Sequence, residues 1–82
     1  MDTTEIINQL TNIWRDQLDE DSIVLTPETT AKDIEGWDSL TNIQLIVATE
    51  KKYKIRFAAS EIMNFKNIGD LAETVLKKTE NA

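Results

Sequence analysis

Apolar residues recur at three- and four-residue steps in three stretches of the chain, a spacing that places side chains on one face of a helix. In the first stretch, residues 3–18, these residues are Ile6, Ile7, Leu10, Ile13, Trp14 and Leu18. Asp2 and Glu5 stand at its start with the spacing of a capping box in which aspartate is the cap. The pattern predicts a first helix over residues 3–18.

A second helix is predicted over residues 39–53. Its apolar stripe consists of Leu40, Ile43, Val47 and Ala48, and it is widened by Leu45 and Ile46. Asp38 precedes the stripe, where its carboxylate can cap the helix by accepting a hydrogen bond from the backbone N–H of Thr41. Ser39 is then the first residue of this helix.

The last part of the chain predicts one short and one longer helix. The short helix, around Ala59–Asn64, turns Ile62 and Phe65 inward, but Ala58 stands where a capping box needs Ser or Thr. The longer helix spans roughly residues 68–78 with Asn67 as its N-cap. Its apolar face consists of Ile68, Leu71, Ala72, Val75 and Leu76.

Residues 19–38 form a long connection between the first and second helices. A structureless loop of that length is uncommon in a small domain, so we expect its apolar residues to attach it to the core, with a turn at residues 26–28. These apolar residues are Ile23, Val24, Leu25, Ile34 and Trp37. The expected fold is all-α: a small bundle of three longer helices and one short helix, in a single domain over residues 1–82.

Composition excludes several classes of function. The 82 residues contain neither cysteine nor histidine, which removes disulfides, thiolate metal sites and the usual general base at neutral pH. No apolar run is long enough to cross a membrane, and the first residues lack the positive charge of a secretory signal, so a cytoplasmic monomer is expected. The net charge is −6, and residues 16–38 hold eight acids against one lysine. This acidity favours a partner of opposite charge or serves solubility, and it argues against nucleic-acid binding.

Ser39 is the residue whose chemistry needs an explanation. The segment GWDSL superficially resembles an esterase signature, but a serine nucleophile needs a base and a group to orient that base, and no histidine is present. The acidic residues fit no specific metal-binding spacing, so no metal site is expected. A serine at a helix N-terminus is instead well placed to carry a phosphate ester. An ordinary helix-start serine without a function is the competing interpretation.

Asp38-Ser39-Leu40, with the acidic connection before it and TNIQLIVATEKKYKI after it, resembles the acyl carrier proteins. The resemblance runs from the first helix to the closing FKNIGDLAETVLKK and covers nearly the whole chain. It implies a non-enzymatic carrier in which Ser39 bears a covalent 4′-phosphopantetheine arm derived from coenzyme A. The thiol of that arm holds acyl groups as thioesters. The implied partners are a phosphopantetheinyl transferase and acyl-handling enzymes: a ligase, a ketosynthase or an acyltransferase.

The resemblance also assigns roles to other residues. Asp38 matches the acid that helps to place the serine for the transferase, and Leu40 matches an apolar contact of that enzyme. The candidate partner-binding residues are Asp33, Glu35, Trp37, Thr41 and Gln44. The candidate residues lining an acyl-chain space inside the bundle are Ile43, Val47, Ile62 and Leu76.

Two departures from housekeeping fatty-acid carriers, which usually read D-L-G-A-D-S-L, point to a specialised carrier. Residues 33–40 read DIEGWDSL, one residue longer and with Trp37 next to Asp38. The helix after the serine, strongly acidic in those carriers, here offers Thr41, Gln44, Lys51 and Lys52. We infer a secondary-metabolite, polysaccharide-modifying or lipid-tailoring pathway, with a lineage variant of the fatty-acid carrier as the competing explanation. A peptidyl or aminoacyl carrier and a degenerate carrier that acts only as a helical interaction module are the alternative functions.

Overall fold

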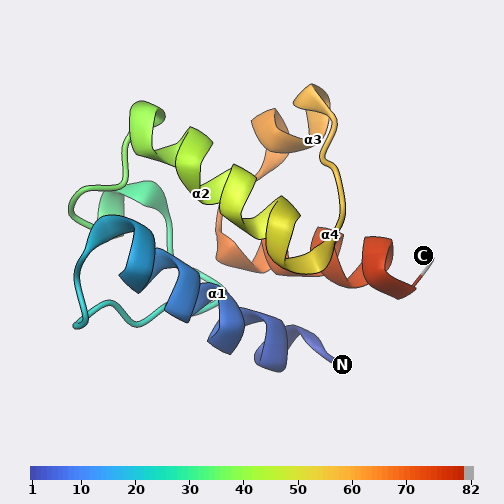
Figure 1. Cartoon of the computed structure of the whole chain (residues 1–82), viewed down its shortest axis with the longest axis horizontal. Helices are drawn as coiled ribbons and strands as arrows, with labels where there is room; N and C mark the ends of the chain where they lie inside the picture. Colours follow the sequence, from blue (N-terminus) through green and yellow to red (C-terminus); the bar gives the residue numbers. More distant parts are fainter. Residues whose placement is uncertain (81–82) are drawn as a thin grey trace.

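The computed structural model describes residues 1–80 and confirms the all-helical fold, with no strand within these residues (Figure 1). The helices are α1 (Thr3–Leu18), α2 (Ser39–Tyr53), α3 (Ala59–Asn64) and α4 (Ile68–Glu80). A single 3₁₀ turn, η1 (Ala31–Asp33), interrupts the long connection and was not predicted. None of the described helices is long and apolar enough to span a membrane.

The helix starts follow the capping residues in the sequence. The Asp2 side chain accepts a hydrogen bond from the Glu5 backbone N–H at 2.9 Å, and the Asn67 side chain accepts one from the Asp70 N–H at 2.9 Å. At α3 the Glu61 carboxylate accepts from the Ala58 N–H, but Ala58 returns no side-chain bond. These bonds join residues three apart, so the local sequence suffices to predict them.

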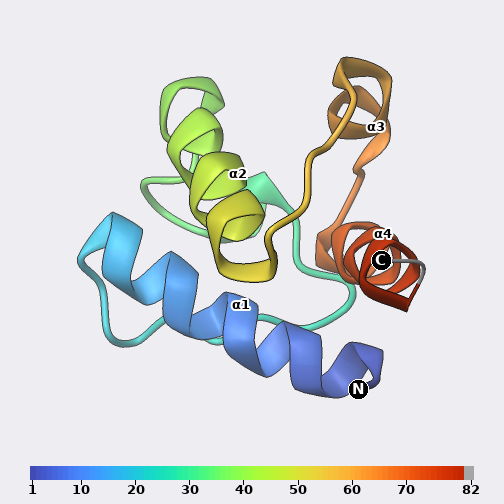
Figure 2. The same ribbon diagram turned by 45° about the vertical axis from the view of Figure 1, so that its right-hand side comes forward.

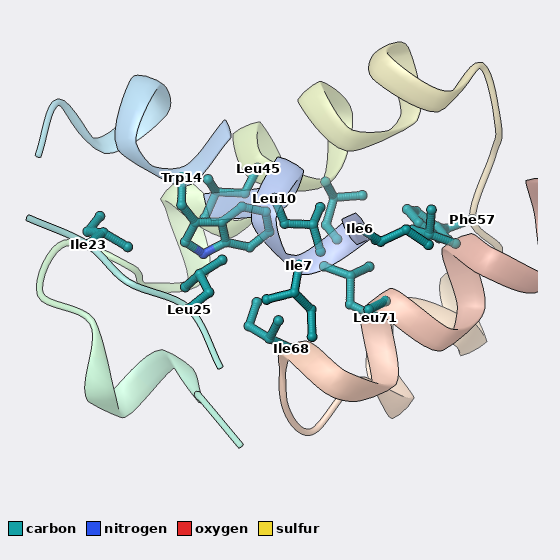
Figure 3. Packing of buried hydrophobic residues seen from close by; sticks show 13 residues of the cluster. Ile6, Ile7, Leu10, Trp14, Ile23, Leu25, Leu45, Phe57, Ile68 and Leu71 are labelled. Atoms are coloured by element: carbon teal, nitrogen blue, oxygen red, sulfur yellow. The ribbon is translucent and has the colours of Figure 1, made fainter. Parts of the chain in front are cut away.

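Helix α1 is the central element of the core, because it packs against both α4 and α2 (Figure 2). The side chains that meet there come from all three helices, and Figure 3 shows them in one cluster. The fully buried members are Ile6, Leu10, Trp14, Leu45, Ile68, Ala72 and Val75. Their burial is the main favourable contribution to folding in a domain of this size.

The long connection is attached to this core, as expected. Ile23 and Leu25 are buried, and the Ile23 carbonyl accepts a hydrogen bond from Arg15 Nε at 2.7 Å. A turn follows at Pro27, whose carbonyl accepts from the Gly69 N–H at 2.8 Å. A Cβ atom at residue 69 would lie 3.0 Å from that carbonyl oxygen, so glycine is needed where the connection crosses the start of α4.

The orientation of α2 differs from the predicted one. The stripe of Leu40, Ile43 and Val47 faces solvent, and the exposed fractions of these residues are 73%, 63% and 41%. The buried face consists of Leu45, Ile46 and Thr49. The helix carries apolar residues of its own on more than one face, so hydrophobic periodicity did not identify the face that is buried. The threonine hydroxyl donates to the Leu45 carbonyl at 2.8 Å, which makes burial of a polar residue acceptable.

The assignment of Ile43 and Val47 to an internal acyl-chain space is therefore wrong for this structure. Both side chains lie on the outer face of α2, away from the cluster formed by α1 and α4. Leu76 is half-buried and packs against the core. Of the four candidates, only Ile62 borders a cavity beside Ser39.

Candidate functional site at the start of α2

Ser39 is exposed at the first position of α2, immediately after a tight turn. Gly36 supplies the turn with a φ of +89°, in the left-handed region that favours glycine. The Gly36 carbonyl accepts a hydrogen bond from the Thr41 hydroxyl at 2.7 Å, so the turn is fastened to the first turn of the helix. The position of Ser39 is therefore set on both of its sides.

Asp38 caps α2 through one oxygen of its carboxylate. Its Oδ1 atom accepts from the backbone N–H groups of Leu40 and Thr41, each at 2.9 Å, while its own N–H donates to the Thr41 hydroxyl. The pKa of Asp38 lies below its usual value, chiefly because its carboxylate accepts the hydrogen bond from the Thr41 N–H. Partial desolvation opposes this shift, and the hydrogen bond from the Leu40 N–H adds to it. The carboxylate is thus a structural anion and a poor proton acceptor for Ser39.

Trp37 connects the turn to two helices. Its ring lies edge to face against Trp14 of α1, with 5.3 Å between the ring centroids. Its Nε1–H donates to Oδ1 of Asn42, a residue of α2, at 2.9 Å. The aromatic side chain that distinguishes this sequence is therefore half-buried and holds the loop before Ser39 in place.

A cavity of about 290 Å³ opens beside Ser39, between α2 and the segment that runs from α3 into α4. This volume is about twice that of an engineered apolar cavity that admits benzene, on the order of 150 Å³. Its apolar lining is formed by Ala31, Trp37, Ile46, Ile62, Phe65, Ile68 and Leu71, and its polar lining by Asp38, Ser39, Asn42, Lys66 and Asn67. A mainly apolar chain attached near the serine could therefore enter the cavity and contact both its apolar side chains and its polar groups.

The other predicted residues fall into two groups. The Asp33 carboxylate accepts from the Thr30 backbone N–H at 2.9 Å and so caps η1, and Thr41 is held by Gly36 and Asp38. Glu35 and Gln44 are exposed. Asp33 and Thr41 therefore have a role in the local structure, whereas Glu35 and Gln44 are available at the surface.

Sequence reasoning missed three of the polar residues of the cavity. Asn42, Lys66 and Asn67 line it together with Ser39, although they lie on α2 and just before α4. Asn67 was predicted only as a helix cap, and Asn42 carried no signal that separates it from any exposed asparagine. Their proximity results from tertiary packing.

Within residues 1–80, the Ser39 hydroxyl stands apart from any base or metal site. Among the described residues the Ser39 hydroxyl has no hydrogen-bond partner, and the carboxylate next to it is occupied by helix capping. No group of potential metal ligands occurs in residues 1–80. What the geometry offers is an exposed hydroxyl at a helix N-terminus, which suits a serine that another enzyme esterifies with a phosphate group.

Comparison with known proteins finds a family that is described by such an attachment. Residues 8–75 match the family described as phosphopantetheine attachment site. The chain is 31% identical over 75 residues to an acyl carrier protein of Clostridium perfringens, covering 92% of this chain and 99% of the relative. It is 28% identical over 74 residues to one from Aster yellows witches'-broom phytoplasma, covering 90% and 97%.

Solved structures agree with the sequence relatives. The solution structure of holo acyl carrier protein from Geobacter metallireducens superposes with a TM-score of 0.86 at 52% identity, over 92% of this chain and 86% of that one. The acyl carrier protein of Thermotoga maritima gives a TM-score of 0.85 at 27% identity, over 99% and 94%. The covalently attached 4′-phosphopantetheine of this family supplies a thiol that forms thioesters with acyl groups, and the cavity beside Ser39 fits such an arm. The match over most of the chain and the shared helical fold place this protein in the acyl carrier protein family.

Proposed function

We propose that Ser39 is the residue that bears the 4′-phosphopantetheine arm of this carrier. The observation that carries the proposal is its exposed hydroxyl at the mouth of the 290 Å³ cavity, at the first position of α2 and without a base of its own. The arm then presents acyl thioesters to enzymes of fatty-acid, polyketide or related biosynthesis. The chain itself catalyses no step, because the proton of Ser39 has no acceptor here and must be removed by the transferase.

Asp38 and Leu40 support this role in different ways. Asp38 fixes the first turn of α2 through its two backbone hydrogen bonds and thereby presents the serine. Leu40 is 73% exposed, which favours a contact with the phosphopantetheinyl transferase over a place in the core. Trp37 and Thr41 act as positioning residues, because both are held by internal hydrogen bonds.

The outer face of α2 is the proposed docking face for partner enzymes. Leu40, Ile43 and Val47 follow one another along it at helical spacing, and such a contiguous exposed apolar surface is typical of interaction sites. Gln44 lies on the same helix and Glu35 in the loop before it. A ligase, a ketosynthase or an acyltransferase would approach the arm across this face.

A specialised pathway remains the favoured context. Partner enzymes of strongly acidic carriers bind through cations, whereas α2 of this chain is apolar along its outer face and basic at its end, with Lys51 and Lys52 in the last turn. The expected setting is a monomer in the cytoplasm, where it meets the transferase and the acyl-handling enzymes. An aminoacyl or peptidyl cargo would use the same arm.

Intact-mass spectrometry tests the attachment site. The chain is incubated with coenzyme A and a broad-specificity phosphopantetheinyl transferase, as the wild type, Ser39→Ala and the control Ser60→Ala, which alters an exposed serine of α3. The wild type and the control are expected to gain one phosphopantetheine, and Ser39→Ala none. An unmodified wild type would favour the degenerate interaction module, and a modified Ser39→Ala variant would move the attachment site elsewhere.

A further inference from the structure

Two asparagine side chains border the same cavity as Ser39 and come from different elements. Asn42 lies on α2, one turn after the serine, and Asn67 caps α4. A primary amide carries one acceptor oxygen and an NH₂ group with two donors. What each side chain offers to the cavity depends on which of its two ends is already occupied.

The orientation of both amides is fixed by chemistry. The group facing Asn42 at 2.9 Å is the indole N–H of Trp37, which can only donate, so it must meet the amide oxygen. The group facing Asn67 at 2.9 Å is the backbone N–H of Asp70, which also only donates. Each oxygen therefore already accepts one internal hydrogen bond, and both NH₂ groups are left without a partner among residues 1–80.

The remaining polar groups of the cavity strengthen this bias. Lys66 is a further donor, and Asp38 already accepts from the backbone of α2 through its Oδ1 atom, so part of the acceptor capacity of the lining is taken up by helix capping. The apolar lining includes the buried residues Ile46 and Ile68. The site thus combines free amide donors with an apolar surface, which suits a chain that carries a carbonyl oxygen and an apolar portion.

We propose that Asn42 and Asn67 are positioning residues that donate hydrogen bonds to carbonyl oxygens of the group carried by Ser39. Trp37 and the first turn of α4 hold the two amides in the donating orientation. This proposal rests on the attachment of the arm at Ser39. The carbonyl comes from one of two sources: the amide groups of the phosphopantetheine arm itself, or a carbonyl group of the acyl cargo.

Nuclear magnetic resonance of the side-chain NH₂ groups separates these sources. The probes are the unmodified chain, the chain loaded from coenzyme A, and the chain loaded from butanoyl- or acetoacetyl-coenzyme A. If the arm supplies the carbonyl, the Asn42 and Asn67 signals shift in all three loaded forms. If the cargo supplies it, they stay unchanged in the form loaded from coenzyme A and shift in the acetoacetyl form, and a shift in the butanoyl form as well assigns the contact to the thioester carbonyl. The NH₂ signals of Asn8 and Asn64, which do not line the cavity, are expected to stay unchanged.

Asn42→Asp and Asn67→Asp provide matched variants, because aspartate keeps the acceptor oxygen and removes the two donors. The Trp37 indole signal reports that the internal bond persists, and Asn64→Asp controls for the added charge. Each cavity variant is expected to lower the ratio of cavity-bound to free arm about fivefold, the effect of one net hydrogen bond. An arm that binds in the cavity should raise the melting temperature of the loaded wild type, and this rise should be smaller in the cavity variants and unchanged in the control.

The proposal is overturned if the Asn42 and Asn67 signals stay unchanged in every loaded form, or if Asn8 and Asn64 shift equally. It is also overturned if both cavity variants keep the full rise in melting temperature. The wild-type spectra answer the question even if a variant fails to fold. A failure of the underlying carrier assignment looks different, because the chain would then gain no mass and no loaded form could be prepared.

Discussion

The half of the molecule formed by α1 and α4 differs from the half formed by α2 and α3. Helices α1 and α4 contribute most of the fully buried side chains, including Ile6, Leu10, Trp14, Ile68 and Val75. Helix α3 has no buried residue, and its Met63 is 84% exposed. The cavity lies on this second side, between α2 and the segment from α3 to α4.

This difference indicates a division of labour within 82 residues. The half formed by α1 and α4 contributes most of the buried apolar side chains, and a small domain has little stability to spare. The loosely packed half leaves room beside Ser39 for an attached chain and exposes the outer face of α2 to partners. Substitutions in the two halves should therefore fail in different measurements.

The largest effect is expected in the packed half. Leu10→Ala removes a fully buried side chain from α1 and should lower the free energy of unfolding by about 2–5 kcal/mol. Denaturant unfolding followed by circular dichroism measures this change. A loss below about 1 kcal/mol would show that the packing around α1 does not dominate the stability.

A smaller effect is expected in the half that holds the cavity. Ile62→Ala shortens a side chain that already borders the cavity. The free energy of unfolding should therefore fall by less than about 2 kcal/mol. Met63→Ala, its exposed neighbour on α3, should change stability by no more than about 0.5 kcal/mol. Denaturant unfolding of Ile62→Ala and Met63→Ala measures both changes. A loss of stability in Ile62→Ala as large as that in Leu10→Ala would contradict the difference between the two halves.

A pH-dependent effect is expected at the start of α2. The hydrogen bonds to its carboxylate lower the pKa of Asp38, so its charged form stabilises the fold above the unfolded pKa, and this contribution is lost as the pH falls through the lowered value. Asp38→Asn keeps the cap and removes the titration. The wild type should melt at a higher temperature than Asp38→Asn near pH 7, with the difference vanishing in acid. A difference that stays constant with pH would assign the effect to packing.

The smallest effect concerns rate alone. Glu35→Lys reverses an exposed charge near Ser39, and Glu73→Lys makes the same change on α4, away from the site. Glu35→Lys should slow loading by the transferase at low salt, and the deficit should diminish as ionic strength approaches about 0.15 M. Asp33 is less suitable for this test, because its carboxylate caps η1. Equal rates for the two variants would place the electrostatic contact elsewhere.

The local features of the fold were predictable from the sequence because they depend on residues close together in the chain. The caps Asp2, Asp38 and Asn67 each bond a backbone N–H three residues ahead, and all were identified. The start of the functional segment at Ser39 follows from the same local rule. Ser39 and its position at the start of the helix could therefore be predicted without knowledge of the tertiary structure.

The features that depend on tertiary packing were predicted only in part: attachment of the long connection to the core was expected, but the inner face of α2 and the cavity were not. The buried face of α2 includes Thr49, whose hydroxyl bonds within its own helix, and hydropathy alone does not assign such a residue to the interior. The contact between Trp14 and Trp37 spans 23 residues of sequence, and it places Trp37 where it orients Asn42. The cavity and its polar residues result from such long-range contacts.

The mass of the chain isolated from its own cells tests the central claim most directly. We expect a mass increased by one phosphopantetheine, with or without an acyl group, and fragmentation that places the increase on Ser39. Detection of only the unmodified chain, or of the modification on another residue, would contradict it.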